Sequence, residues 1–119
     1  MTQTLPSATL SAEAWAAAHD ELVGHLQALI RIPSINPPDP PGPELEAADY
    51  LAAALEREGL RPEVSEPVGG RGNVVVRLKG DGTGGDPLLL LSHLDVDPAR
   101  EEVGWTHPPF GGEVAHGYI

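Results

Sequence analysis

The 119-residue chain contains no cysteine, and it has only one methionine and one phenylalanine. The absence of cysteine excludes disulfide bridges and thiolate metal sites. Any metal ion held by this chain would therefore have histidine, aspartate or glutamate ligands. Glycine and proline, in contrast, number 14 and 13. Because they cluster in a few segments, they indicate loops and turns between regular elements and not general disorder.

Positive charge is also scarce, because 7 lysines and arginines stand against 18 aspartates and glutamates, for a net charge of -11. So acidic a surface repels phosphates and anionic lipid headgroups, which excludes nucleic acid and membrane surfaces as partners. The charge also favours solubility. No apolar run approaches the ~20 residues that span a bilayer. The first residues lack the basic start and apolar core of a signal peptide, so we expect a cytoplasmic protein.

The first half of the chain predicts two helices after a flexible leader at 1–10. Ser11 is a suitable N-cap for a helix that should end before Pro33. Its expected apolar face comprises Trp15, Ala18, Leu22, Leu26 and Leu29. A proline-rich loop follows at 33–43. A second helix is expected from about Glu44 to Glu58, with Gly59 as its stop signal.

The second half predicts strands. Segment 61–67 is a weak candidate, and 73–80 (NVVVRLKG) is a stronger one because it is rich in valine and bounded by glycine. Segment 87–93 (PLLLLSH) is apolar on both faces, which is typical of a strand buried in the middle of a sheet. The glycine-rich stretch 80–86 reads as a hairpin turn. Residues 112–119 could form one strand, or two short strands that turn at His116 and Gly117.

An imidazole and a carboxylate close the most apolar segment, in "LLLLSHLDVDPA" (88–99). If strand geometry persists, His93 and Asp95 share a face, because successive side chains alternate. A carboxylate bonded to one ring nitrogen fixes the histidine tautomer and leaves the other nitrogen for a metal ion. The spacing therefore suits a metal-binding His93 with an orienting Asp95. The alternative is an exposed polar end of a strand, because H-x-D is a common tripeptide.

A serine hydrolase is disfavoured, although a serine precedes the histidine. Adjacent residues in a strand face opposite ways, so Ser92 cannot reach His93 as a nucleophile reaches its base. The chain also lacks a G-x-S-x-G elbow.

Several segments together resemble an amidohydrolase and peptidase family. They are "LLLLSHLDVDPA", "WTHPPFGGEV" (105–114), "GYI" (117–119) and the earlier "LQALIRIPSINPP" (26–38). The family includes acetylornithine deacetylase, succinyl-diaminopimelate desuccinylase, aminoacylase and the glutamate carboxypeptidases. The chain resembles its N-terminal catalytic region from about Trp15 onward. The chain departs from the family pattern at two places, because many relatives have a hydrophobic residue where Asp97 stands and an acidic residue near His116.

The resemblance implies an α/β catalytic domain that holds two zinc ions, or cobalt in their place. His93 would ligate one zinc. Asp95 would be a catalytic residue that holds the imidazole of His93 in place. The substrate would be an N-acyl amino acid or small peptide, cleaved at an amide bond, and an inserted second domain would allow a homodimer. The general base and the other ligands would lie beyond Ile119. We therefore expect 11–119 to be a truncated N-terminal part of the domain, with two helices and a partial sheet, inactive alone.

Two alternatives to this enzyme remain open, namely a non-catalytic relative of the same fold and a structural fragment with no role of its own. Other polar residues favour structural interpretations. His107 belongs to a packing patch with Trp105, Pro108, Pro109 and Phe110, and His116 to a turn. His19 and His25 lie on different helix faces and are expected at the surface, as is the acidic pair Glu101 and Glu102.

Overall fold

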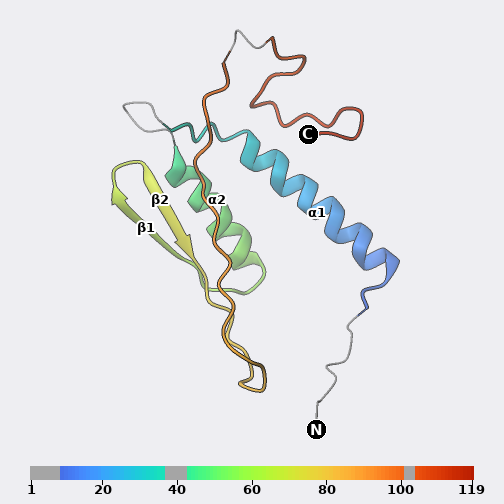
Figure 1. Cartoon of the computed structure of the whole chain (residues 1–119), viewed down its shortest axis with the longest axis vertical. Coiled ribbons are helices and arrows are strands. Elements are labelled where there is room, and N and C mark those ends of the chain that lie inside the picture. Colours follow the sequence, from blue (N-terminus) through green and yellow to red (C-terminus); the bar gives the residue numbers. More distant parts are fainter. Residues whose placement is uncertain (1–8, 37–42, 101–103) are drawn as a thin grey trace.

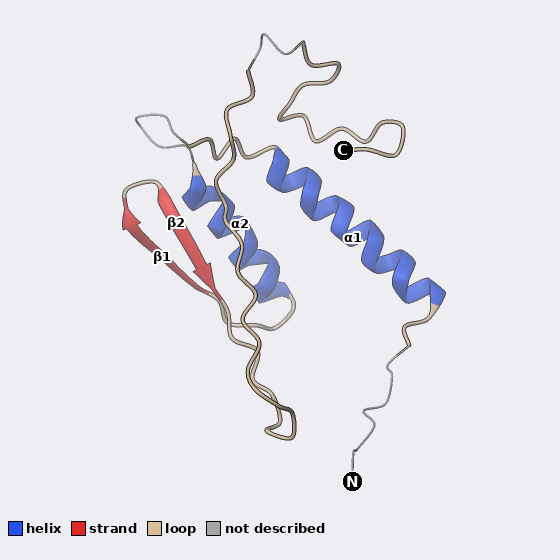
Figure 2. Ribbon diagram, viewed as in Figure 1, coloured by secondary structure: helices blue, strands red, loops and turns tan. Residues whose placement is uncertain are grey.

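The computed structural model describes residues 9–36, 43–100 and 104–119. Two helices are followed by a two-stranded antiparallel sheet, as Figures 1 and 2 show. Their bounds are α1 Ala12–Ile30, α2 Glu44–Arg57, β1 Glu63–Val68 and β2 Arg71–Val75. The expected partial α/β fold, two helices and then a small sheet, is confirmed. The leader up to residue 8, most of the proline-rich loop (37–42) and the acidic pair at 101 and 102 lie outside the described residues.

Helix α1 starts and ends where its capping signals predict. The Ser11 hydroxyl accepts a hydrogen bond from the backbone N–H of Ala14 at 3.2 Å, which satisfies one of the free donors of the first turn. The helix ends at Ile30, before Pro33. None of its residues is buried, however, and Trp15 and Leu22 are more than 60% exposed. The apolar face predicted for this helix exists, but little of the described chain covers it.

Helix α2 forms the core together with the β-hairpin, and Figure 1 shows it lying beside the two strands. The buried apolar residues of the helix are Ala47, Ala48 and Ala52. The glycine at position 72 of β2 allows this strand to approach α2 closely, because a Cβ placed on Gly72 would lie 2.7 Å from Leu45 Cα. Gly59, with a φ of 77°, follows the helix as expected of a C-terminal glycine.

The two strands pair in register from Glu63 opposite Val75 to Ser65 opposite Asn73, and an irregularity follows before Val68 pairs with Arg71. Pro67 lies within this irregular stretch, where the missing N–H costs no ladder bond. The expected strands at 61–67 and 73–80 are therefore present with shifted bounds, and the second is shorter than predicted.

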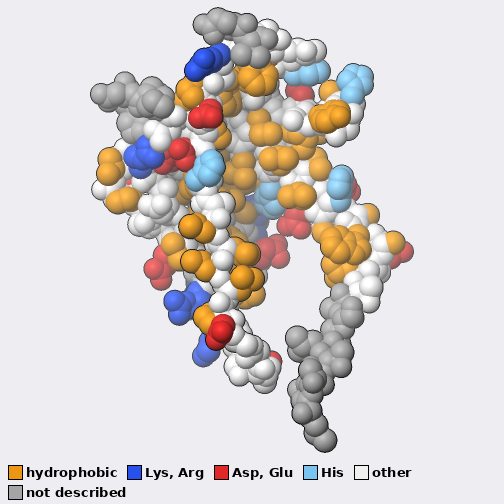
Figure 3. Space-filling view, viewed as in Figure 1, with side chains coloured by type: hydrophobic (Ala, Val, Ile, Leu, Met, Phe, Trp, Pro, Cys, Tyr) orange, Lys and Arg blue, Asp and Glu red, His pale blue; other side chains and the backbone are white. Residues whose placement is uncertain are grey.

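The prediction of a buried central strand at 87–93 differs from the structure. The segment forms no ladder with any described residue. Its four leucines are 81–89% exposed. Hydrophobic side chains accordingly crowd the face drawn in Figure 3. The physical reason is that a strand apolar on both faces needs neighbouring strands and two covering layers. The described residues provide neither for this segment.

The C-terminal residues fold back as a minimal antiparallel turn. Ala115 and Tyr118 exchange backbone hydrogen bonds of 2.9 and 3.0 Å. His116 and Gly117 between them have positive φ values of 53° and 83°, as a tight two-residue hairpin turn requires. The turn at His116 is thus confirmed, with a single bridge between Ala115 and Tyr118 in place of the expected strands.

The molecule is extended, with axes of 60, 39 and 25 Å and a radius of gyration of 18.0 Å. A compact domain of this length would have a radius of about 14 Å. Figure 1 shows the reason for the larger radius: α1 diverges from the unit formed by α2 and the hairpin, and the C-terminal segment lies near the end of α1. No helix within the described ranges is long and apolar enough to cross a membrane.

Candidate metal centre

The imidazole of His93 and the carboxylate of Asp95 lie side by side. Nδ1 of His93 is 3.1 Å from Asp95 Oδ1 and 2.7 Å from the Asp95 backbone oxygen. A backbone carbonyl can only accept a hydrogen bond, so Nδ1 must carry the ring proton. In neutral His93, the lone pair then lies on Nε2. The two side chains share one side of the backbone, although the backbone around them is not part of a ladder.

The pair is accessible to solvent, with the side chain of His93 83% exposed and that of Asp95 33% exposed. Among the described residues, the hydrogen bonds of His93 involve Asp95 alone, so Ser92 is not paired with it as a nucleophile would be. The roles of His93 as a metal ligand and of Asp95 as its clamp stay predictions.

A residue that the sequence did not single out completes the arrangement. Asn36 Nδ2 donates a hydrogen bond of 3.0 Å to Asp95 Oδ2. This bond is the main reason why the pKa of Asp95 is below its ordinary value, with smaller contributions from its own backbone and from His93. The carboxylate is thus favoured in its ionised form. The only available signal was the polar Ser-x-Asn in the proline-rich segment 33–38.

The chain segment that carries Asn36 is joined to the one that carries Asp95. Ile35 and Val96 form a parallel bridge, with backbone bonds from Asn36 N–H to Val96 O and from Val96 N–H to Ser34 O. The buried Ser34 hydroxyl also donates to the Leu94 carbonyl at 2.6 Å. Two segments about 60 residues apart in the chain therefore meet at the candidate centre.

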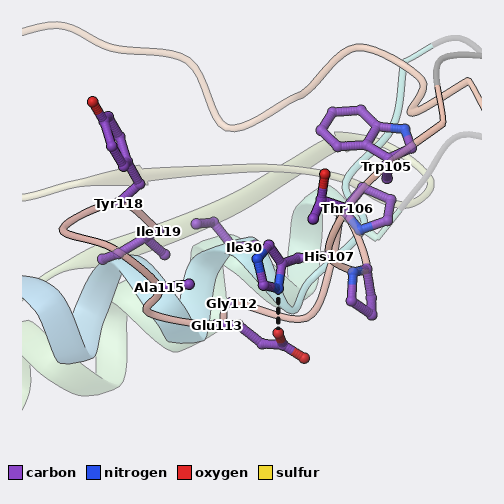
Figure 4. A pocket seen from close by; sticks show the side chains of 11 residues that line it. Ile30, Trp105, Thr106, His107, Gly112, Glu113, Ala115, Tyr118 and Ile119 are labelled. Carbon is purple, nitrogen blue, oxygen red and sulfur yellow. Dashed lines mark hydrogen bonds and ion pairs between the residues drawn. The ribbon is translucent and has the colours of Figure 1, made fainter.

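A second histidine–carboxylate pair lies at a hollow near the C-terminus. His107 Nδ1 is 2.8 Å from Glu113 Oε2, and both side chains are about half exposed. Figure 4 shows the pair close to Ile30, with Trp105 and Tyr118 farther away on either side, and all of these residues line the same cavity of about 330 Å³. Trp105 and Pro109 line this hollow and an adjacent one, and Trp105 remains 52% exposed, so the packing patch stays a prediction.

The adjacent hollow, of about 290 Å³, is mostly apolar, and Asp97 and Val96 are part of its lining. Asp97 thus lies at this hollow, and it takes no part in the hydrogen bonds of His93. Neither of the two hollows is lined by His93.

The remaining histidines are not at the candidate centre. His19 is exposed beside Asp20, as expected. The expectation that His25 is a surface residue is wrong, because it is half-buried and its Nδ1 bonds the Tyr50 hydroxyl of α2 at 2.7 Å. The error arose because Tyr50 is 25 residues away in the chain, out of reach of a helix-face argument. Among the residues that the structure describes, no three histidines, aspartates or glutamates are grouped to hold a metal ion.

Comparison with known proteins finds several relatives that share one name. Proteins named succinyl-diaminopimelate desuccinylase match from Methylorubrum extorquens (42% identical over 96 residues, 78% of this chain and 23% of the relative), Methylobacterium nodulans (40% over 93 residues, 78% and 22%) and Bradyrhizobium sp. (37% over 95 residues, 76% and 23%). No family model matches the chain, and no solved structure matches it significantly.

The chain spans about a quarter of the length of these curated relatives, and more than three quarters of the chain takes part in the match. The resemblance to this family is thereby confirmed over the aligned part of the chain. Over the aligned residues, this chain is similar to proteins of the peptidase and deacylase family that includes succinyl-diaminopimelate desuccinylase.

Proposed function

We propose that the protein carrying this chain is a metal-dependent hydrolase that cleaves an amide bond of an N-acyl amino acid or small peptide. The observation that carries the proposal is the His93–Asp95 pair, which lies in a chain homologous to desuccinylases. The relatives are named for succinyl-diaminopimelate, an acylated amino acid. We extend that substrate class, and not the individual compound, to this protein.

The donor chemistry at His93 fits a zinc or cobalt ion. Its Nδ1 proton is held by two acceptors of Asp95, so Nε2 presents a lone pair toward solvent. A negative carboxylate on the far ring nitrogen also raises the basicity of the imidazole as a ligand. A metal ion bound at such a site supplies Lewis acidity toward an amide carbonyl and toward water.

His93 alone is an incomplete ligand set, because a catalytic zinc takes about three protein ligands. We propose that the further ligands and the general base come from parts of the complete protein outside residues 1–119, as does a second metal site. The 119-residue chain alone should then neither retain zinc through purification nor hydrolyse an amide. We also propose that the complete protein forms a homodimer and lies in the cytoplasm, and that cobalt can take the place of zinc.

The test uses the protein expressed from the complete reading frame that contains this chain. His93→Ala should reduce zinc content, measured by atomic emission, by one ion per chain. It should also reduce the rate of N-acyl amino acid hydrolysis by at least about 100-fold, because loss of a ligand costs at least as much as loss of a hydrogen-bond partner that orients it. His107→Ala is the matched control, because its imidazole also bonds a carboxylate but belongs to the predicted packing patch. It should retain full zinc content.

Two results would contradict the proposal. Full zinc content and activity in His93→Ala would remove His93 from the metal site. A wild-type protein that contains no zinc and cleaves no acylated amino acid would instead indicate the non-catalytic relative.

A further inference from the structure

Asp95 is held from two sides at once. Its Oδ1 faces His93 Nδ1 at 3.1 Å, and its Oδ2 accepts from Asn36 Nδ2 at 3.0 Å. Each carboxylate oxygen thus has its own donor. A rotation of the carboxylate that weakened one bond would weaken the other, so the orientation of the group is fixed by two points.

The donor Asn36 is itself fixed by the backbone. The parallel bridge between Ile35 and Val96 places Asn36 opposite the chain segment that carries Asp95. The bond from Ser34 Oγ to the Leu94 carbonyl, together with the burial of Ser34, holds the same two segments together on the other side of the bridge. The Asn36 amide therefore starts from a position that does not depend on the histidine.

We infer that Asn36 is a positioning residue for the metal centre, which acts on His93 through Asp95; this inference rests on the proposed function. The exposed imidazole has no packing to hold its ring, since 83% of its surface is open to solvent. Its orientation depends on Asp95, and the orientation of the Asp95 carboxylate depends on Asn36. Outer hydrogen-bond partners of this kind change metal affinity by about 10- to 100-fold.

Substitution of Asn36 by alanine removes the amide donor and leaves the local backbone bonds possible. The bridge uses the N–H of Asn36 and not its side chain, so Asn36→Ala should retain it. Asn73→Ala is the matched control, because Asn73 lies exposed on β2 and its side chain makes no hydrogen bond with the described residues.

The experiment is a double-mutant cycle in the protein expressed from its complete reading frame. Zinc affinity is measured by competition with a chromophoric chelator for the wild type, Asn36→Ala, Asp95→Ala and the double variant. We expect Asn36→Ala to weaken zinc binding about 10-fold. The double variant should bind zinc no more weakly than Asp95→Ala alone, because Asn36 acts through Asp95. Asn73→Ala should bind like the wild type.

A second readout needs no metal. In ¹⁵N spectra of the metal-free protein, Asn36→Ala and Asp95→Ala should move the His93 ring signals in the same direction, and Asn73→Ala should leave them in place. Wild-type zinc affinity in Asn36→Ala, additive losses in the double variant, or unmoved His93 signals would overturn the inference. Undiminished zinc binding in His93→Ala, in contrast, would overturn the proposed function itself, and the role of Asn36 at a metal centre with it.

Discussion

At the scale of single residues, ionised side chains are held by specific donors. The carboxylate of Asp95 has one donor on each oxygen, and Asp81 accepts two bonds from Thr83, at 2.8 Å from its N–H and 2.6 Å from its hydroxyl. Each arrangement lowers the pKa of the aspartate, since hydrogen bonds favour the ionised form.

Removal of the Asn36 amide should therefore raise the pKa of Asp95. A folded-state pKa below the unfolded value of about 3.9 means that Asp95 stabilises the fold above that pH. This stabilisation is lost as the pH falls through the lower, folded value. Asn36→Ala should lose part of it, and ¹³C titration of the Asp95 carboxyl should show a pKa closer to the ordinary value. An unchanged titration would show that Asn36 does not favour the ionised form.

Glu44 is a buried carboxylate whose charge has one cationic partner among the residues that the structure describes. Its side chain is 7% exposed, and Arg71 lies 3.1 Å away. Arg71→Ala would leave the charge without compensation and should reduce the free energy of unfolding by about 2–3 kcal/mol. Urea denaturation measures this change, and the exposed Arg77→Ala is the matched control. Equal stability of the two variants would contradict the account of this pair.

At the scale of elements, contact between α2 and the hairpin depends on a glycine. A methyl group at Gly72 would meet the Leu45 backbone at 2.7 Å and Ala48 Cβ at 3.0 Å. Backbone atoms cannot move aside as a flexible side chain can, so Gly72→Ala should cost about 1–3 kcal/mol of unfolding free energy. Gly80→Ala is the control, since no atom lies within 4 Å of its added methyl. The two variants are compared by urea denaturation, and no loss in Gly72→Ala relative to Gly80→Ala would refute the close contact.

The sequence predicted the helices well because their signals are local. The hydroxyl of Ser11 and the positive φ at Gly59 act within a few residues of the helix ends. The contacts that define the candidate centre and the core are not local. Asn36 bonds Asp95, 59 residues away in the chain, and Glu44 pairs with Arg71, 27 residues away. No local sequence motif predicts either contact. For the same reason, the sequence identified His93 and Asp95, two residues apart, and missed Asn36.

At the scale of the whole molecule, apolar surface is left open by the four leucines of the extended segment 88–91. An extended chain with unpaired backbone groups and large apolar side chains tends to pair with another strand. Substitution of Leu89 and Leu91 by serine should therefore reduce self-association of the 119-residue chain, measured by sedimentation velocity. Leu10→Ser, at another exposed leucine, is the control. Equal self-association in all three proteins would show that the leucine segment is not the contact surface.

The central claim is that Nε2 of His93 is a zinc ligand while Asp95 holds Nδ1. Anomalous diffraction at the zinc edge, from crystals of the protein expressed from its complete reading frame, tests it most directly. The account predicts a zinc peak about 2.0–2.1 Å from His93 Nε2, with Asp95 still bonded to Nδ1. A zinc ion bound elsewhere, with His93 Nε2 facing solvent, would contradict it.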